Sequence, residues 1–149
     1  MPANERSKGL TVGVWVAQVA VAGILGMTLP FKLTGAEESV ILFEEIAGSI
    51  GMEGMSDAMR IGLALAELLV VVLLLVPRTA ALGGLGALGM MSGAALTHLA
   101  LVGIEVPTDR ATPPTMDGGS LFMMALIALV ASAFVVVIRR KELPIVGGA

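Results

Sequence analysis

Four long apolar stretches constrain this chain more than any other feature of its sequence. They cover residues 10–33, 58–76, 79–103 and 120–138. A helix needs about 20 largely apolar residues to cross the hydrocarbon core of a bilayer, and each stretch meets or nearly meets that length. The sequence therefore predicts an all-α fold, a four-transmembrane-helix antiparallel bundle, with residues 1–149 forming a single integral membrane domain.

The overall composition fits a membrane location and excludes several classes of function. Of the 149 residues, 56% are hydrophobic and 14% are charged, whereas an average soluble domain carries roughly 25% charged residues. The net charge is −3 and no basic stripe is present, which argues against nucleic acid as a partner. The chain has no cysteine and one histidine, so thiolate metal sites and a haem held by two of its histidines are excluded. We therefore expect no metal site, no cofactor held by the chain alone, and the lipid bilayer as its surroundings.

The first apolar stretch has two interpretations. Arg6 and Lys8 precede it, and residues 20–23 (AVAG) resemble a signal-peptidase site. The apolar run continues to Leu33, however, so a retained transmembrane helix is the favoured interpretation.

Basic residues predict the orientation of the helices. Lysine and arginine are enriched in the cytoplasmic loops of membrane proteins. With both termini in the cytoplasm, that side carries six basic residues and the outer side carries three, which are Lys32, Arg60 and Arg110. We therefore expect a protein of a bacterial or archaeal cytoplasmic (inner) membrane with both termini cytoplasmic. The outer side also collects nine acidic residues, which we interpret mainly as a solvated face.

The connections between the stretches differ in kind. Residues 36–50 (AEESVILFEEIAGSI) place their apolar side chains on one face, which predicts a short amphipathic helix in the first outer loop. Residues 105–120 are rich in proline, glycine and aspartate and predict an irregular loop. Only residues 77–78 (PR) separate the second and third stretches, so these two helices must be antiparallel neighbours.

One carboxylate, Glu67, lies inside the second apolar stretch. A charged group at such depth costs several kcal/mol unless it is paired or hydrated, and it usually faces the interior of a bundle. Because Cα–Cβ bonds tilt towards the N-terminus of their own helix, Glu67 is expected to lean outwards, and Lys32 and His98 inwards. These three side chains can therefore converge in the outer half of the bundle. Arg60, on almost the same helix face and about 10 Å further out than Glu67, would close the cluster.

Each member of this candidate binding or proton-transfer site also has a purely structural interpretation. Glu67 and Lys32 could form an ion pair that only holds two helices together. His98 could hydrogen-bond to a loop, and Arg60 could anchor a helix end at the lipid headgroups. Gln18 is most simply explained by a hydrogen bond between helices. No catalytic residue can be named from the sequence.

The third apolar stretch is rich in glycine, at Gly83, Gly84, Gly86, Gly89 and Gly93. In lipid, small residues allow helices to approach one another closely. Tight packing within the bundle is the favoured interpretation, and a homo-oligomer formed through glycine-rich helix faces is the alternative.

Four short elements follow one another in a characteristic order. They are FKLTG after the first stretch, a glutamate early in the second, PRTAALG at the inner turn and GAALTHL in the third stretch. In this order the chain, over about residues 15–104, resembles the DoxX-like family of small four-helix integral membrane proteins. The resemblance implies that Lys32, Glu67, Arg78 and His98 are typical of the family. The segment GMEGMSDAM and the proline-rich outer loop depart from the commoner compact pattern and leave the partner open.

The resemblance implies a role in a membrane redox system. Some members of the family are subunits of a thiosulfate:quinone oxidoreductase, and others are linked to sulfur or oxidative-stress metabolism. For this chain it implies an oxidoreductase subunit or accessory protein that acts with a quinone and a redox partner protein. Two other functions stay open. One is a non-enzymatic scaffold, assembly or lipid-binding protein whose Glu67–Lys32 pair is structural, and the other is a transporter built from oligomers.

Overall fold

Helices make up most of the computed structural model, which describes residues 3–143, with side chains from residue 7 onward. Residues 1–2 and 144–149 of the predicted domain, and the side chain of Arg6, lie outside the described residues. The five α-helices of the described range are α1 Ala3–Thr34, α2 Glu37–Ser49, α3 Ser56–Leu75, α4 Ala80–Thr97 and α5 Ser120–Arg139. Three shorter helical segments are η1 Glu53–Met55, η2 His98–Val102 and η3 Arg140–Glu142.

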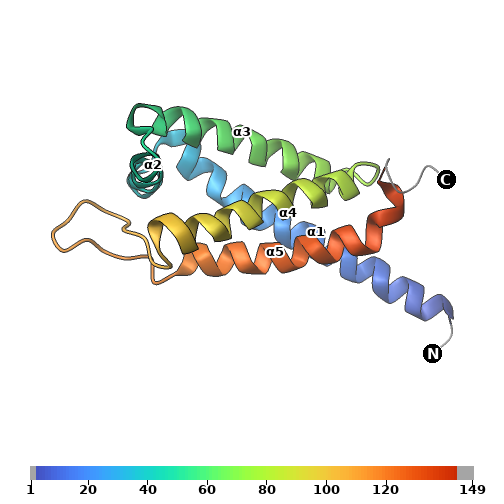
Figure 1. Cartoon of the computed structure of the whole chain (residues 1–149). Coiled ribbons are helices and arrows are strands. Elements are labelled where there is room, and N and C mark those ends of the chain that lie inside the picture. The colour runs from blue at the N-terminus through green and yellow to red at the C-terminus, as the bar shows by residue number, and fades with distance from the viewer. Residues whose placement is uncertain (1–2, 144–149) are drawn as a thin grey trace.

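Four of these helices form an antiparallel bundle. Within the described residues, α1, α3, α4 and α5, each with its flanking residues, are long and apolar enough to cross a membrane. They alternate in direction, so that α1 begins and α5 ends at the same end of the bundle (Figure 1). α1 and α4 each pack against both α3 and α5. The predicted all-α bundle is thereby confirmed, although α1 begins at Ala3, seven residues before the predicted span.

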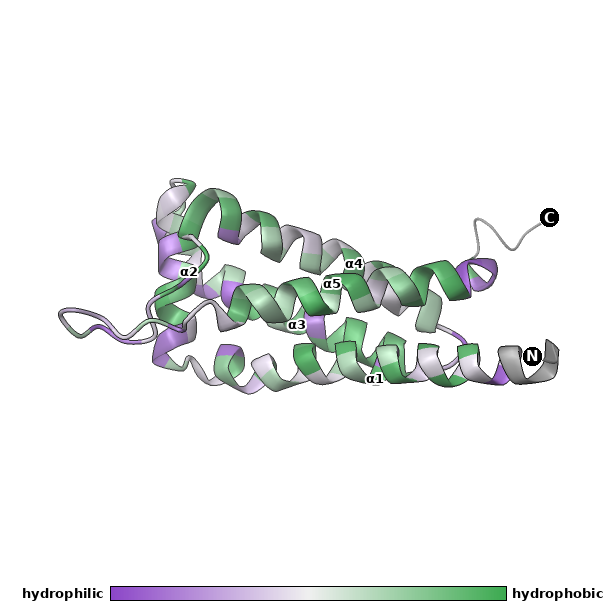
Figure 2. Cartoon of the chain, turned by 90° about the horizontal axis from the view of Figure 1, so that it is seen from below, coloured by the Kyte–Doolittle hydropathy of each residue, from purple (hydrophilic) through white to green (hydrophobic). Residues whose placement is uncertain are grey.

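The predicted amphipathic helix is α2, which lies across one end of the bundle rather than along it (Figure 1). Phe43 and Ala47 lie on the buried face of α2, whereas Glu37 and Glu44 are exposed. We call this end the α2 end, and we call the opposite end, where residues 76–79 join α3 to α4, the turn end. Figure 2 shows hydrophobic residues along the long helices and hydrophilic residues gathered at α2 and the neighbouring loop.

Three glycines bring α4 close to its neighbours towards the turn end. A Cβ atom at Gly83 would lie 2.5 Å from the backbone nitrogen of Leu74 in α3. Gly84 and Gly86 are similarly close to valine side chains of α5 and α3. Tight packing within the bundle is thus what these three glycines provide.

The other two glycines of α4 behave differently. A Cβ atom at Gly89 or Gly93 would meet nothing within 4 Å among the described residues. Both positions are exposed on the bundle. A homo-oligomer through this face of α4 stays a prediction.

A polar cluster around Gln18 is buried at the turn end. Gln18 Nε2 donates to the carbonyl oxygen of Leu74 at 2.7 Å, and Gln18 Oε1 accepts from Arg139 Nε at 2.7 Å. Arg139 also lies over the ring of Trp15 and pairs with Glu142. Gln18 therefore links α1, α3 and α5, which is the interhelical role that the sequence indicates for it.

Candidate functional site

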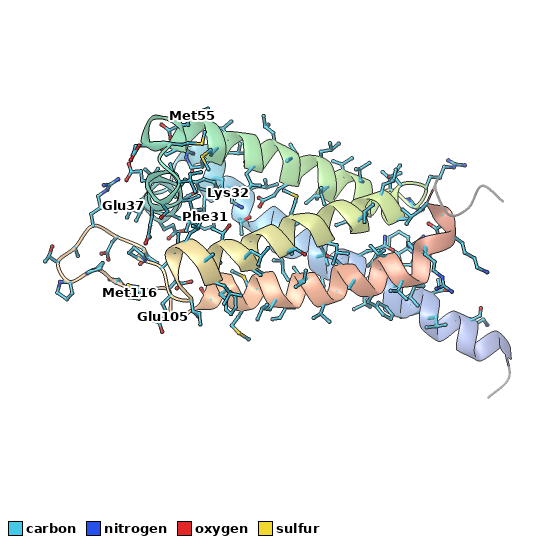
Figure 3. All side chains as sticks on the ribbon, viewed as in Figure 1. Phe31, Lys32, Glu37, Met55, Glu105 and Met116 are labelled. Carbon is cyan, nitrogen blue, oxygen red and sulfur yellow. The ribbon has the colours of Figure 1, made fainter. Side chains whose placement is uncertain are left out.

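The centre of the candidate site is an ion pair between α1 and α3. Lys32 Nζ lies 2.6 Å from each carboxylate oxygen of Glu67. The side chain of Glu67 is 4% exposed and that of Lys32 is 13% exposed. Lys32 lies near α2, at the α2 end of α1 (Figure 3). Helix direction predicts that Lys32 and Glu67 point towards each other along the bundle, and their charged groups are in contact.

Thr28, one helical turn before Lys32, completes this ion pair. Its Oγ1 accepts a hydrogen bond from Lys32 Nζ at 3.0 Å and lies 3.3 Å from Glu67 Oε2. An ammonium group has three hydrogens, and Lys32 directs them at the two oxygens of Glu67 and at Thr28. The sequence analysis does not single out Thr28, although its spacing from Lys32 is a signal for it, because residues four apart on a helix lie on the same face.

His98 is positioned by a change of helix geometry at the end of α4. From His98 to Val102 the chain forms a π-helical turn, and the N–H of Gly103 donates to the carbonyl of His98 at 2.8 Å. Such turns are rare and often occur at functional sites. The wider turn continues α4 to the α2 end, where His98 is 6% exposed and its ring centroid lies 5.6 Å from that of Phe122.

The hydrogen bond of His98 determines which ring nitrogen is free. Nδ1 lies 2.8 Å from the carbonyl oxygen of Gly103. A carbonyl oxygen only accepts, so Nδ1 carries a hydrogen and a neutral imidazole then has its lone pair on Nε2. Nε2 has no hydrogen-bond partner in the part of the chain that the structure describes. His98 thus bonds to the loop, as its structural interpretation predicts, and keeps one acceptor free.

Arg60 contacts the backbone of α1 rather than the ion pair itself. Its Nη1 donates to the carbonyl oxygen of Lys32, and its Nη2 lies 2.7 Å from Asp57 Oδ1. The last carbonyls of a helix have no partner within the helix, and α1 ends just before Gly35, whose φ is +69°. Arg60 is 8% exposed and supplies a donor to this helix end.

A cavity of about 630 Å³ lies beside the ion pair, and we call it the α2-end cavity. Its wall comes from all five α-helices, η2 and the loop before α5. Most wall residues are apolar, and the ionisable ones are Lys32, Glu38, Glu67, His98 and Asp117. Ligand-binding cavities typically measure roughly 300–1,000 Å³ and combine apolar walls with a few convergent polar groups. The α2-end cavity has this size and character.

The cavity unites three of the four predicted site residues. Lys32, Glu67 and His98 all belong to its wall, whereas Arg60 is not among the described wall residues. Within the described part of the chain, His98 makes no hydrogen bond to the ion pair. The three residues therefore share one space without forming one hydrogen-bonded network.

Ser39 in α2 is a wall residue that the sequence did not indicate. It is 6% exposed, and its Oγ has no hydrogen-bond partner among the described residues. Six other helical hydroxyls donate to the carbonyl four residues earlier, at Thr11, Thr34, Ser49, Ser92, Thr97 and Ser132. Ser39 lies in the first turn of α2, where the helix has no carbonyl four residues back. Its environment depends on how α2 packs, for which the sequence carries no signal.

The loop between η2 and α5 forms part of the cavity wall and is more regular than predicted. An antiparallel bridge joins Pro107 to Met116, and the backbone N–H of Thr108 donates to the carbonyl of Thr115 at 2.8 Å. Arg110 connects this hairpin to α2, with Nη2 2.8 Å from Glu44 Oε2. The loop and α2 are therefore tied together at the α2 end.

Asp117 holds the base of the hairpin to the start of α5. Its carboxylate accepts from the backbone N–H groups of Val106, Gly119 and Leu121, at 2.9 to 3.0 Å. Partial burial acts to raise the pKa of Asp117, but these bonds and one from Ser120 outweigh it and hold the pKa below its ordinary value. Asp117 thus holds the first turn of α5 from a position just before the helix.

No family model, curated protein or solved structure matches this chain. The function therefore has to be argued from the α2-end cavity and from the sequence elements themselves.

Proposed function

We propose that this chain is a DoxX-like membrane protein that binds a quinone in the α2-end cavity, as a subunit or accessory of a membrane redox system. One observation carries the proposal: the Lys32–Glu67 ion pair and His98 lie in the wall of a single, largely apolar cavity of about 630 Å³. A quinone combines a polar ring with an apolar tail. An apolar cavity with polar groups on one part of its wall fits that combination.

Access from the lipid supports a membrane-dissolved ligand. Two wall residues of α1, Met27 and Phe31, are 52% and 47% exposed. Exposed apolar side chains in the cavity wall would border a route from the lipid between the helices. A quinone could follow this route without crossing water.

The bound group and the chain would divide the chemistry between them. A quinone supplies two-electron redox chemistry when it is bound. Glu67 and His98 are the groups of this chain that can give or take the accompanying proton, provided that they lie within hydrogen-bonding reach of the ring. The chain has no cysteine and no thiolate centre of its own, so a redox partner protein completes the system.

We also propose that the turn end faces the cytoplasm of a bacterium or archaeon. Lys8, Arg78, Arg140 and Lys141 are exposed and belong to the segments of the turn end, and a bias of this kind is typical of cytoplasmic loops. The natural chain has no cysteine, so single cysteines can report orientation. In intact cells, a membrane-impermeant maleimide is expected to label Arg110→Cys and to spare Arg78→Cys.

Native mass spectrometry of the purified full chain tests the ligand proposal. Solvent extraction would identify whatever co-purifies. A stoichiometric quinone is expected with the natural chain and with Glu53→Gln, an exposed control outside the cavity wall, and is expected to be absent from Glu67→Gln. An empty natural chain that stays empty when a short-tailed quinone is added in excess would refute the proposal.

A second function is favoured by one specific observation. The three hydrogens of Lys32 are all used by Glu67 and Thr28, which is what a purely structural clamp between α1 and α3 requires. A scaffold, assembly or lipid-binding protein would then be the better description. In that case, folded Glu67→Gln protein keeps whatever assembly and ligand content the natural chain has.

A further inference from the structure

Hydrogen-bond donors in the wall of the α2-end cavity are almost all committed to the protein. Lys32 donates to Glu67 and Thr28, and Thr28 donates to the carbonyl of Leu25 at 2.9 Å. Three further wall hydroxyls donate internally, namely Thr97, Thr108 and Ser120. In the described part of the wall, Ser39 is the one side-chain hydroxyl left without a bond. A bound molecule therefore finds few donors.

Acceptors in the same wall are still available. A carboxylate offers about four lone-pair positions, and Glu67 receives bonds from Lys32 alone while Thr28 gives its one hydrogen to Leu25. His98 keeps the lone pair of Nε2 when its Nδ1 donates to Gly103. Glu38 of α2 adds an exposed carboxylate. The wall consequently favours a ligand that brings hydrogens of its own.

The charges of the wall point in the same direction. Three carboxylates, Glu38, Glu67 and Asp117, face one ammonium group, Lys32, so negative charge is in excess by two. An anion would enter this field with only the hydroxyl of Ser39 free to donate to it, and like charges repel strongly where water is excluded. Neutral molecules with O–H or N–H groups are the ligands that the wall accommodates best.

We propose, on the basis of the quinone-binding function above, that the α2-end cavity prefers the reduced form of the ligand, the quinol, over the quinone. A quinol presents two O–H donors, whereas a quinone presents two carbonyl acceptors and no donor. Glu67 and His98 can accept from a quinol. A quinone in the same place offers no hydrogen to the spare lone pairs of Glu67 or to Nε2 of His98, and a site whose buried acceptors are left without a donor rejects a ligand strongly.

The test uses the full chain in lipid nanodiscs and one short-tailed benzoquinone in two redox states. The quinone is titrated in air-equilibrated buffer and its quinol is titrated anaerobically with excess reductant, while a dialysis measurement reports the bound fraction. We expect the quinol to bind at least about tenfold more tightly, which corresponds to one hydrogen bond to a charged group.

Two variants assign the preference to the wall. His98→Phe removes one acceptor but keeps the Lys32–Glu67 ion pair and an aromatic ring beside Phe122. It is expected to weaken quinol binding about tenfold and not to weaken quinone binding, because it removes an acceptor that the quinone leaves unpaired. Glu53→Gln, an exposed change outside the wall, is expected to alter neither affinity.

The possible outcomes separate this inference from the function on which it rests. A quinol preference that falls in His98→Phe supports the inference. Equal affinities, or tighter binding of the quinone, overturn the inference and leave the quinone-binding function intact. A folded natural chain that binds neither form overturns the function and the inference together.

Discussion

The two ends of the bundle bury polar side chains in different ways. At the turn end, Gln18 is fully buried, both ends of its amide are hydrogen-bonded, and Gly83 brings the neighbouring backbones into contact. At the α2 end, all three hydrogens of Lys32 are bonded to Glu67 and Thr28, but the ion pair borders a cavity. A buried polar group whose hydrogen bonds are satisfied is therefore by itself no evidence of function. The space beside it is what sets the α2 end apart.

The largest effect is expected from breaking the ion pair. Lys32→Met leaves the carboxylate of Glu67 buried without its counter-charge, which should destabilise the protein by about 3–5 kcal/mol. The double variant Lys32→Met with Glu67→Gln should recover part of this loss. Unfolding titrations in detergent measure both. A double variant no more stable than the single one would show that the two residues are not energetically coupled.

A smaller loss is expected from filling the close contact of the turn end. In Gly83→Ala the new Cβ meets the backbone of Leu74 at 2.5 Å before any relaxation, and overpacking of this kind costs about 1–3 kcal/mol. Gly89→Ala is the matched control, because open space surrounds that position. Thermal unfolding would contradict the packing difference if the two variants lost equal stability.

Ser39→Ala tests whether the unpaired hydroxyl in the cavity wall lowers the stability of the folded protein. Removing a buried hydroxyl that lacks a partner should stabilise the protein by up to about 1 kcal/mol. Ser132→Ala is the control, since its hydroxyl donates to the carbonyl of Ala128 at 2.6 Å and its removal should be neutral or destabilising. A destabilised Ser39→Ala variant would show that the hydroxyl does have a partner.

The smallest effect concerns acidic pH. Because the pKa of Asp117 is lowered in the folded protein, its contribution to stability is present above the ordinary aspartate pKa. It is lost as the pH falls through the lowered value. Melting temperatures followed from pH 6 down through the ordinary aspartate pKa, about 3.9, should therefore fall less in Asp117→Asn than in the natural chain. Glu105→Gln, an exposed change in the same loop, should follow the natural chain.

Much of the fold could be predicted because lipid simplifies the problem. Hydropathy and length locate the four long helices, and the direction of Cβ atoms along each helix is enough to predict that Lys32 and Glu67 meet. The helical period puts Arg60 on almost the same face of α3 as Glu67, two turns away, but it does not predict where the side chain goes. The side chain turns to the end of α1, because the unpaired carbonyl of Lys32 lies within its reach.

Other features of the site depend on packing that no pattern encodes. The π turn that carries His98 departs from the helical period on which sequence reasoning relies. The burial of Ser39 follows from how α2 lies across the bundle. The cavity is the space that these irregular elements leave between them. The sequence predicts only that Lys32, Glu67 and His98 converge there, and it does not predict the size of the cavity.

The ion pair between Arg110 and Glu44 has a consequence for how fast a ligand enters and leaves the α2-end cavity. Both side chains are about half exposed, at 58% and 46%, and such surface pairs contribute about 0–1 kcal/mol. Thermal motion can therefore release α2 from the hairpin often, and dissolved salt weakens the ion pair further. The occupancy of the cavity should then be nearly independent of ionic strength, while the residence time of its occupant should shorten as salt is added.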